Sequence, residues 1–369
     1  MAMEEARITV MMTKSATRFV SPLTFEALTD NHVFTDMFGA GVGEAMAHIT
    51  LPRQSDMVLV APATAHTIAR LAQGLADDLL ATAVLASKAP VIICPAMNSV
   101  MLSHPATLRN IETLKELDYT VVEPDAGLLA CGDEGAGRLP DWQRVREVLL
   151  ASLSPDDMKG RQVLITAGPT REPLDPARYL SNRSSGKMGY ALARTALRRG
   201  AQVTLISGPV CLPPPTGINV VPVVTAREML EAVREHAPHN SIVVKAAAVA
   251  DFRPAVECDH KLKKQQSCET IELAMNTDIL AELGANRKND QILVGFAAES
   301  CHHQAEGLRK LQEKNVDLMV VNDIIGEKTG FDVDTNQVTI ISHDDVLTLP
   351  LQSKEETANS IWDRVIRLF

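Results

Sequence analysis

Short runs of β-branched and other apolar residues alternate with amphipathic stretches along almost the whole chain. In the first half the apolar runs occupy residues 8–12, 57–61, 91–94 and 120–122. After a polar segment with proline and glycine at 154–161, the runs resume at 162–167, 202–206, 219–223, 241–246, 291–297 and 317–321. Strands that alternate with helices form mostly parallel sheets covered by helices. The sequence therefore predicts an α/β protein of two tandem three-layer domains, 1–153 and 162–369, joined by the linker 154–161.

The stretches between these runs carry apolar residues at helical spacing. In the first half we expect helices over 21–28, 77–87, 107–117 and 142–153, and one that follows residues 62–66 and runs through 72. In the second half we expect them over 186–199, 226–236, 278–287, 304–314 and 354–368. Residues 337–341 and 346–349 are typical of a terminal hairpin.

Composition excludes several classes of protein. The 369 residues suffice for two domains of ordinary size, each with its own core. A formal net charge of -10 argues against a nucleic-acid partner, because no basic excess balances a phosphate backbone. No apolar run reaches membrane-spanning length, and no signal peptide is visible. Six cysteines without a CxxC pair predict a reducing, cytoplasmic location rather than a disulfide framework.

A long connection from Gly168 to Gly189 separates the strand at 162–167 from the next helix. In open α/β sheets, ligands bind outside the carboxyl ends of the strands, where this loop lies. Its backbone N–H groups adjoin a helix N-terminus, which favours anions such as phosphates. The loop also carries Arg178, Asn182, Arg183 and Lys187. An ordinary surface loop rich in turn-forming residues is the alternative interpretation.

Further charged residues of the second half follow strands or share a helix face. They are Asp251 after the strand at 241–246, Lys261 in a poorly periodic stretch that reads as a mobile flap, a helix cap at Asn276 or Asp278, and Lys310 and Lys314 four residues apart. Each alone is ordinary, since a lysine pair at this spacing is usually a solvated face. Together they predict a row of cations along one sheet edge, which suits a polyphosphate.

Three loops of the first half lie where a doubly wound sheet places its chemistry: 61–67, 95–101 and 130–138. The last is rich in glycine and carries the thiol of Cys131, which could close over a substrate. His48 adds a possible proton carrier. Each of these residues has a purely structural alternative, because a lone histidine or cysteine more often serves packing.

Taken together, these motifs resemble those of the phosphopantothenoylcysteine decarboxylases, homo-oligomeric flavin-containing cysteine decarboxylases. The match rests on Thr13-Lys-Ser-Ala-Thr-Arg-Phe19, His48-Ile49, Ala61-Pro-Ala-Thr64, Pro95-Ala-Met-Asn98 with Met101, and Ala130-Cys-Gly-Asp133. The resemblance implies a flavodoxin-like domain with bound FMN, which oxidises the substrate's cysteine thiol so that loss of the carboxylate leaves an ene-thiolate. It also implies roles for single residues: Cys131 as proton donor, His48 as acid/base group, Asn98 and Met97 as substrate contacts, and Thr13, Pro62, Ala63 and Thr64 as FMN contacts.

The start of the chain departs from that family. There, a first strand, a glycine turn that receives the flavin phosphate and a helix precede the strand that residues 8–12 match. Only residues 1–7 precede it here. We therefore expect the first strand and helix to be missing, FMN to bind weakly and the sheet to be incompletely paired. His66 and Leu102 are smaller departures, at positions where the family usually has asparagine and often tryptophan.

From Gly160 onward the chain resembles phosphopantothenate–cysteine ligase, and the two halves together resemble the bifunctional enzymes of coenzyme A biosynthesis found in bacteria. The match rests on Ser181-Asn-Arg-Ser-Ser-Gly-Lys-Met-Gly189, Ala247-Ala-Val-Ala-Asp251 and Gly295-Phe-Ala-Ala-Glu299. The resemblance implies that 4'-phosphopantothenate attacks CTP with Mg²⁺, forming an acyl-cytidylate and pyrophosphate, and that cysteine then displaces CMP. It also suggests trimers of the first domain and dimers of the second.

The residues that this second resemblance assigns fall into two groups. Lys261 would stabilise the phosphates, while Asn182 and Arg178 would grip phosphopantothenate and its activated acyl group. The CTP pocket would comprise Lys245, Ala246, Ala247, Asp251, Lys261, Thr277, Asp278, Ile279, Leu280, Phe296, Lys310 and Lys314. The sequence does not indicate metal ligands.

Two other functions compete with this one. A nicotinamide-dependent oxidoreductase would carry GxGxxG directly after a strand, and that motif is absent from the sequence. The Ser184–Gly189 stretch is not a P-loop either, because it lacks GxxxxGK[ST]. A nucleotide-binding or scaffold protein without catalysis is the second alternative, and nucleotide-dependent pyrophosphate release would discriminate it from a ligase.

Overall fold

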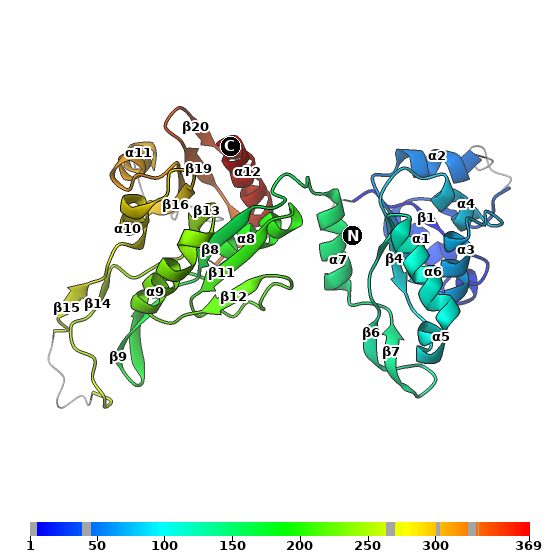
Figure 1. Ribbon diagram of the computed structural model, residues 1–369, viewed down its shortest axis with the longest axis horizontal. Helices are drawn as coiled ribbons and strands as arrows, with labels where there is room; N and C mark the ends of the chain where they lie inside the picture. The colour runs from blue at the N-terminus through cyan, green and yellow to red at the C-terminus, as the bar shows by residue number, and fades with distance from the viewer. Residues whose placement is uncertain (1–5, 39–45, 263–269, 300–302, 324–329, 331) are drawn as a thin grey trace. The chain divides into compact units, whose positions relative to one another are not determined.

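The computed structural model describes residues 6–38, 46–262, 270–299, 303–323, 330 and 332–369. The chain forms two compact units, Met1–Leu153 and Ser154–Phe369, each built of strands and helices (Figure 1). Both units contain parallel sheets, which confirms the predicted α/β class.

In the first unit a parallel sheet in the order β3-β4-β5 joins Val58–Ala63, Val91–Pro95 and Thr120–Val121. Successive side chains of a strand point to opposite faces. On one face Ile93 packs with residues of α3 (Ala65–Ala72), α4 (Leu79–Leu85) and α6 (Pro105–Glu116). On the other, Ile92 and Cys94 pack with Val145 and Leu149 of α7 (Trp142–Leu153). The unit therefore has the three layers that the sequence predicts.

The start of the first unit is less regular. Strand β1 covers Val10–Met11, and it pairs in parallel with β2 (Val33–Phe34) to form a separate two-stranded sheet within the described residues. Between them lie a short 3-10 helix η2 (Ala16–Arg18) and α1 (Pro22–Thr29). Helix α2 (Ala47–Gln54) was not predicted, because Pro52 lies inside it and its apolar periodicity is weak.

The second unit is built on an eight-stranded sheet in the order β12-β11-β8-β13-β16-β17-β19-β20. The strands in that order are Asn219–Pro222, Gln202–Ser207, Gln162–Ala167, Ile242–Lys245, Ile292–Glu299, Leu318–Asp323, Val338–Ile341 and Val346–Thr348. The first six are parallel, and β19 and β20 are antiparallel to their neighbours. Strand order reverses between β8 and β13, which is the switch point where sheets of this kind bind ligands.

Helices cover both faces of this sheet. On one face α8 (Lys187–Arg198) and α12 (Lys354–Ile366) pack on residues such as Val163 and Ile165. On the other face α9 (Ala226–His236), α10 (Ile279–Asn286) and α11 (His303–Glu313) pack on Leu164 and Leu293. A 3-10 helix, η4 (Ala237–His239), follows α9. Nearly every helix and main strand predicted for this half is present to within two residues.

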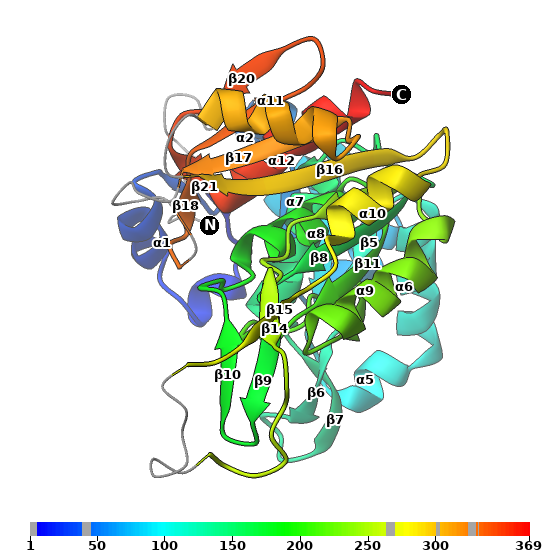
Figure 2. The ribbon, with the colours of Figure 1, turned by 90° about the vertical axis from the view of Figure 1, so that its left-hand side faces the viewer.

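Several short antiparallel pairs were not predicted. Strands β9 (Arg171–Asp175) and β10 (Arg178–Ser181) occupy most of what the sequence indicated as an irregular loop, and β14 (Phe252–Pro254) pairs with β15 (Leu273–Met275). The first unit adds α5 (Ser99–Ser103), β6 (Asp125–Leu128) and β7 (Glu134–Arg138), and the second adds β18 (Thr335–Asn336) with β21 (Gln352–Ser353). Hairpins β9–β10 and β14–β15 lie side by side beyond the main sheet (Figure 2). Prolines and charged residues interrupt their apolar alternation, so the strand pattern was hidden.

Across the described part of the chain, helices are too short or too polar to traverse a lipid bilayer.

Helix α12 begins with a buried lysine. Lys354 is only 6% exposed, and its ammonium group donates hydrogen bonds to the carbonyl oxygens of Gly330 (3.1 Å) and Thr335 (3.0 Å). Burial, with a smaller contribution from the positive charge of Lys187, lowers the pKa of Lys354 to about 8.

This pKa predicts a stability that depends on pH. The folded pKa lies below the usual pKa of 10.5, so between about pH 8 and pH 10.5 the unfolded chain binds one more proton than the folded chain. The free energy of unfolding should gain up to a few kcal/mol from Lys354 as pH rises through that window, while below about pH 8 the buried charge exerts its full penalty. In urea unfolding series, Lys354→Met should lose this slope. Exposed Lys159, changed in the same way, should keep it, and equal slopes in wild type and Lys354→Met would contradict the prediction.

Candidate active sites

The crevice at the switch point of the second unit is formed by the segments that follow β8 and β13. Two threonine hydroxyls hold these segments together: Thr166 Oγ1 accepts from the N–H of Ala247 at 3.2 Å, and Thr170 Oγ1 accepts from the N–H of Ala250 at 3.0 Å. The N–H of Thr170 also donates to the carbonyl of Ala248 at 3.4 Å. The loop after β13 is therefore fixed against the loop after β8.

Asn182, predicted to bind substrate, lies in this crevice. Its Nδ2 donates to the carbonyl oxygens of Ala248 (3.0 Å) and Val249 (3.1 Å). The neighbouring Ser181 Oγ donates to the carbonyl of Thr170 at 2.7 Å. The Asn182 side chain thus connects the two walls, although the residue as a whole is exposed.

A close approach of two glycines brings the start of α8 to the crevice. Gly168 and Gly186 both have φ of 76°, which favours glycine. A Cβ on Gly186 would lie 2.7 Å from Val210 Cγ1 and 3.4 Å from Gly168 Cα, so a larger residue would not fit without movement. The N-terminus of a twelve-residue helix therefore adjoins the switch point, as an anion site requires.

Lys245, the last residue of β13, lies near several charged side chains. Burial lowers the pKa of Lys245, while the carboxylates of Asp278 and Asp251 act against that shift. Lys310 and Lys314 are close enough to lower it slightly further. Asp251, Asp278, Lys310 and Lys314, all predicted to bind nucleotide, therefore lie near Lys245, whereas Lys261 is not part of this set.

The lysines of this cluster are paired with acids. Lys310 Nζ lies 2.5 Å from Glu299 Oε1, at the end of β16, and Lys314 Nζ lies 2.8 Å from Asp278 Oδ2. Asp278 also caps α10, because its Oδ1 accepts from the N–H of Ala281 at 2.9 Å. The sequence predicted a row of cations, and the structure corrects this to a mixed set in which carboxylates orient the ammonium groups. Sequence reasoning singled out the Glu299 motif but not its pairing with Lys310.

The remaining residues predicted to bind nucleotide differ in exposure. Ala247, Ile279 and Leu280 are at most 6% exposed and all three belong to the core, so these residues could reach a ligand only through their backbone. Ala246 and Phe296 are partly buried against the opposite core, and Thr277 and Asp251 are exposed. Asn276 ties this region to the loop after β13, since its Nδ2 donates to the carbonyl of Ala250 at 2.8 Å.

Arg178, predicted to bind substrate, forms hydrogen bonds with Asp175 and with the backbone of Leu262. Its Nε donates to Asp175 Oδ2 at 2.9 Å, and an Nη donates to the same carboxylate and to the carbonyl of Leu262 at 3.0 Å. Lys261, next to Leu262, is exposed. The rest of the predicted basic run, Lys263 and Lys264, lies outside the described residues. Asp175 was not singled out in the sequence, where nothing indicates a contact 87 residues away.

In the first unit, the hairpin β6–β7 positions Cys131. The carbonyl of Gly137 accepts from the N–H of Met97 at 2.9 Å, which docks the hairpin on the segment after β4. At its tip, Asn98 Nδ2 donates to Cys131 Sγ at 3.2 Å and to Asp133 Oδ2 at 3.3 Å, and the thiol donates to Asp133 at 3.3 Å. Asn98 and Cys131, predicted from separate motifs, therefore lie in one exposed cluster with Asp133, which sequence reasoning did not assign.

Gly137 offers a test of this docking. A Cβ at this position would lie 2.0 Å from the carbonyl oxygen of Met97, and its φ is 145°. Gly137→Ala should therefore push the hairpin away and destabilise the first unit by about 1–3 kcal/mol in urea unfolding. Gly132→Ala is the matched control, because φ there is 91° but no atom lies within 4 Å of the added Cβ. If both variants unfolded at the same urea concentration, the steric explanation would be wrong.

The other predicted residues of the first unit lie at strand ends or on α2. Thr13 follows β1, and the exposed Pro62 and Thr64 lie at the carboxyl end of β3 with the buried Ala63. Thr64 caps α3 by accepting from the N–H of Thr67 at 3.3 Å. His48 lies on α2, and its Nδ1 is buried without a hydrogen-bond partner among the described residues.

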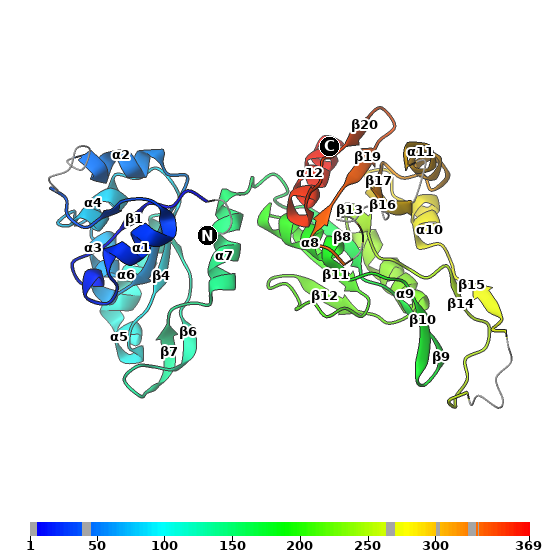
Figure 3. The ribbon, with the colours of Figure 1, turned by 180° about the vertical axis from the view of Figure 1, so that it is seen from behind.

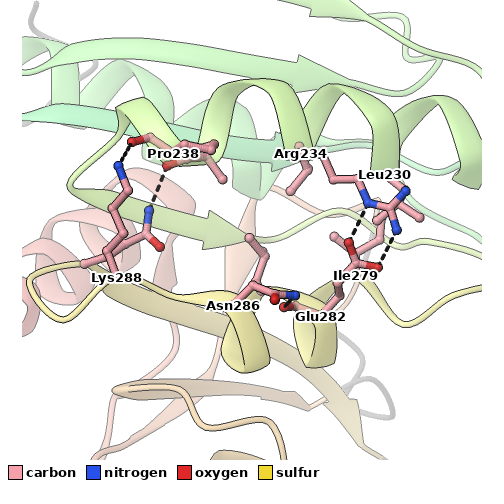
Figure 4. Close-up of a pocket in the computed structure, with 11 residues that line it drawn as sticks. Leu230, Arg234, Pro238, Ile279, Glu282, Asn286 and Lys288 are labelled. Carbon is pink, nitrogen blue, oxygen red and sulfur yellow. Dashed lines mark hydrogen bonds and ion pairs between the residues drawn. The ribbon is translucent and has the colours of Figure 1, made fainter.

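A separate cavity of about 200 Å³ lies between α9 and α10 (Figure 4). Its floor includes Leu230 and Ile279, and its rim carries Arg234, which forms two hydrogen bonds with Glu282 at 2.6 and 2.8 Å. The Arg234 guanidinium is thus already paired, and of the residues predicted to bind substrate or nucleotide, Ile279 alone lines this cavity.

Comparison with known proteins extends over nearly the whole chain. The Flavoprotein family model matches residues 1–154, and the model of the DNA/pantothenate metabolism flavoprotein C-terminal domain matches residues 158–368. The coenzyme A biosynthesis bifunctional protein CoaBC of Bacillus subtilis (strain 168) is 47% identical over 368 residues, which cover 98% of this chain and 90% of the relative. That of Escherichia coli (strain K12) is 42% identical over 365 residues, with the same shares covered. The chain belongs to the CoaBC family.

Two solved structures agree with the fold of the second unit. The crystal structure of the C-terminal domain of a CoaBC protein is 42% identical, covers 58% of this chain and 97% of its own, and has a TM-score of 0.50. A flavoprotein of DNA/pantothenate metabolism from Streptococcus pneumoniae, 19% identical over 57% of this chain and 100% of its own with a TM-score of 0.50, shares the fold. The resemblance inferred from the motifs is therefore confirmed for the chain as a whole.

Proposed function

We propose that the chain catalyses two consecutive steps of coenzyme A biosynthesis. The second unit joins 4'-phosphopantothenate to cysteine with CTP through an acyl-cytidylate, and the first unit decarboxylates the product with FMN. The observation that carries the ligase proposal is the crevice at the switch point, where Asn182, the start of α8 and the cluster around Lys245 converge on the carboxyl ends of β8 and β13. Membership of the CoaBC family supports both steps.

Ligation requires charge neutralisation and positioning more than covalent help. Asn182 and the N-terminus of α8 would orient phosphopantothenate in the crevice. Lys245, Lys310 and Lys314 would neutralise the nucleotide's phosphates, with Asp278 and Glu299 holding two of the ammonium groups in place. Lys261 would add charge where negative charge develops during transfer of the cytidylyl group.

Mg²⁺ would accompany the triphosphate. Within the described residues no group of three or more His, Cys, Asp or Glu side chains is arranged to hold a metal ion. Mg²⁺ commonly binds through one or two carboxylates together with substrate phosphates and water. CTP oxygens would therefore supply most of its ligands in this site.

In the first unit, the substrate carboxylate would be bound by Asn98, whose amide already donates to a carboxylate, that of Asp133. Cys131 lies 3.2 Å from that amide, within reach to donate a proton to the decarboxylated carbon. FMN, when bound, supplies the two-electron oxidation of the substrate thiol. Thr13 and the Pro62–Thr64 segment would hold FMN, and the unpartnered Nδ1 of His48 fits a site completed by another molecule.

A residue from a second copy of the chain could also supply the hydrogen-bond partner that His48 Nδ1 lacks among the described residues. Phe19 and Phe38 of the first unit are 89% and 81% exposed, as expected of apolar residues that meet another subunit. We therefore expect a homo-oligomer. A cytoplasmic location is part of the same proposal, because the four cysteines among the described residues are all free thiols.

A direct assay tests the proposal. The purified protein would be mixed with 4'-phosphopantothenate, cysteine and either CTP or ATP, while pyrophosphate release and an absorbance spectrum are recorded. Release with CTP and little with ATP, together with a flavin spectrum, is expected. Absence of pyrophosphate with either nucleotide would overturn the ligase proposal and favour a scaffold protein, while a colourless protein would overturn FMN binding.

A further inference from the structure

One buried carboxylate connects the substrate loop to the segment that carries Lys261. Asp175, the last residue of β9, is 3% exposed. Its Oδ1 accepts from the N–H groups of Ala177 (2.8 Å) and Arg178 (2.9 Å), which closes the turn of the β9–β10 hairpin. Its Oδ2 accepts from the Arg178 side chain and from the N–H of Leu262 at 3.1 Å.

Leu262 is thus held at both of its backbone polar groups. Its N–H donates to Asp175, and its carbonyl accepts from Arg178 Nη at 3.0 Å. A third bond connects the same two segments, since the N–H of Cys258 donates to the carbonyl of Leu174 at 3.1 Å. Strand β14, which leads into this segment, lies beside β9 (Figures 1 and 2).

The hydrogen bonds of Asp175 and Arg178 to the backbone of Leu262 form a clamp, and an ionised carboxylate is well suited to it. The guanidinium of Arg178 holds the pKa of Asp175 far below its usual range, with the N–H groups of Ala177 and Leu262 adding to the effect against burial. Asp175 is therefore ionised at neutral pH, and its hydrogen bonds are charge-assisted. Packing of side chains into the core does not explain why Leu262 is held here, because only its backbone N–H and carbonyl groups take part in these bonds.

We propose that Asp175 is a positioning residue for the ligation: with Arg178 it fixes the backbone of Leu262 and thereby the point at which Lys261 is presented. This rests on the proposed ligase function, because Lys261 matters only if phosphates are transferred there. Arg178 has two roles in this proposal. It is expected to bind substrate, and it also bonds both Asp175 and the carbonyl of Leu262. Binding of phosphopantothenate and the position of Lys261 are consequently coupled through one side chain.

Asp175→Asn tests the clamp with little change in shape. An asparagine oxygen in the place of Oδ1 can still accept from the N–H groups of Ala177 and Arg178, but Nδ2 in the place of Oδ2 cannot accept from Leu262 or from the Arg178 side chain. Amide hydrogen exchange at Leu262 should accelerate about tenfold or more, and kcat of pyrophosphate release should fall about tenfold or more. The KM for CTP should change much less, because the Lys245 cluster lies on other elements.

Leu262→Pro provides a second variant, because it removes the N–H group and leaves the Asp175–Arg178 pair in place. It should lower kcat as well, and the double variant should be no slower than Asp175→Asn alone. Arg234→Gln serves as the control, since it breaks an ion pair on the cavity rim of the same unit and should leave kcat unchanged.

The outcomes separate this proposal from the ligase function. If wild type releases no pyrophosphate, the ligase function is wrong, yet slow exchange at Leu262 that is lost in Asp175→Asn would still support the clamp. Unchanged exchange at Leu262 in Asp175→Asn would overturn the clamp whatever the activity. Faster exchange with unchanged kcat would overturn the positioning role.

Discussion

Replacing Lys261 with glutamine should slow ligation by about a hundredfold or more while leaving the fold intact. Preorganised charge at a reacting phosphate typically contributes this much to the rate. Lys261 is exposed, and substitution of exposed residues usually changes stability by less than about 0.5 kcal/mol. Initial rates of pyrophosphate release at saturating CTP measure the effect, and urea unfolding of the same preparation checks the fold.

Lys159→Gln is the matched control for that variant. Lys159 has a side chain 79% exposed, lies in the same unit and pairs with Asp156 at 3.2 Å. Its replacement removes the same charge beside Gly200, at the amino end of β8, whereas the crevice lies at the carboxyl end, so the rate should stay near that of wild type. A Lys261→Gln enzyme that turned over as fast as the Lys159→Gln control would remove Lys261 from the mechanism.

The main sheet of the second unit could be predicted closely from the sequence. Strands such as Gln162–Ala167 and Gln202–Ser207 are buried on both faces, so they appear as continuous apolar runs with clear ends. The loop that carries Asn182 could also be located, because it follows the first of these strands and precedes a helix. Local patterns sufficed wherever the position of a residue depends on the end of a strand.

Long-range contacts could not be predicted in the same way. The bond between Asp175 and Leu262 joins residues 87 positions apart, and the Lys314–Asp278 pair joins residues 36 apart. Neither contact leaves a periodic signal, because each depends on how loops from different strands meet at one edge. The row of cations was wrong for this reason: sequence showed the lysines, while their carboxylate partners became apparent only in three dimensions.

The same limit applied to the first unit, where Asn98 and Cys131 came from separate motifs. Their family resemblance suggested one site, but only the docking of β7 on Met97 explains how the thiol reaches the amide. Asp133 lies in the same motif as Cys131. The spacing of residues in the sequence does not indicate that Asp133 accepts hydrogen bonds from both Asn98 and Cys131. Sequence identified the participants, and the backbone determined their geometry.

Trp362→Ala should be the most destabilising single change in the second unit. Trp362 is fully buried between α12 and α8, and its Nε1 donates to Thr195 Oγ1 at 2.9 Å and to the carbonyl of Leu192 at 3.2 Å. Truncating a buried tryptophan costs about 3–5 kcal/mol, and a domain of this size is stable by only about 5–15 kcal/mol. Urea unfolding of the second unit should show this loss, together with a fall in ligase activity at 37 °C that follows the folded fraction.

Trp362→Phe separates packing from hydrogen bonding, because it keeps much of the ring volume and removes the Nε1 donor. It should cost less than the alanine variant but more than a volume change alone, since Thr195 is 1% exposed and would lose one of its partners. Trp142, 39% exposed on α7 of the first unit, is the control: Trp142→Ala should leave the unfolding of the second unit unchanged. A Trp362→Ala protein within about 1 kcal/mol of wild type would mean that α12 contributes little to the second core.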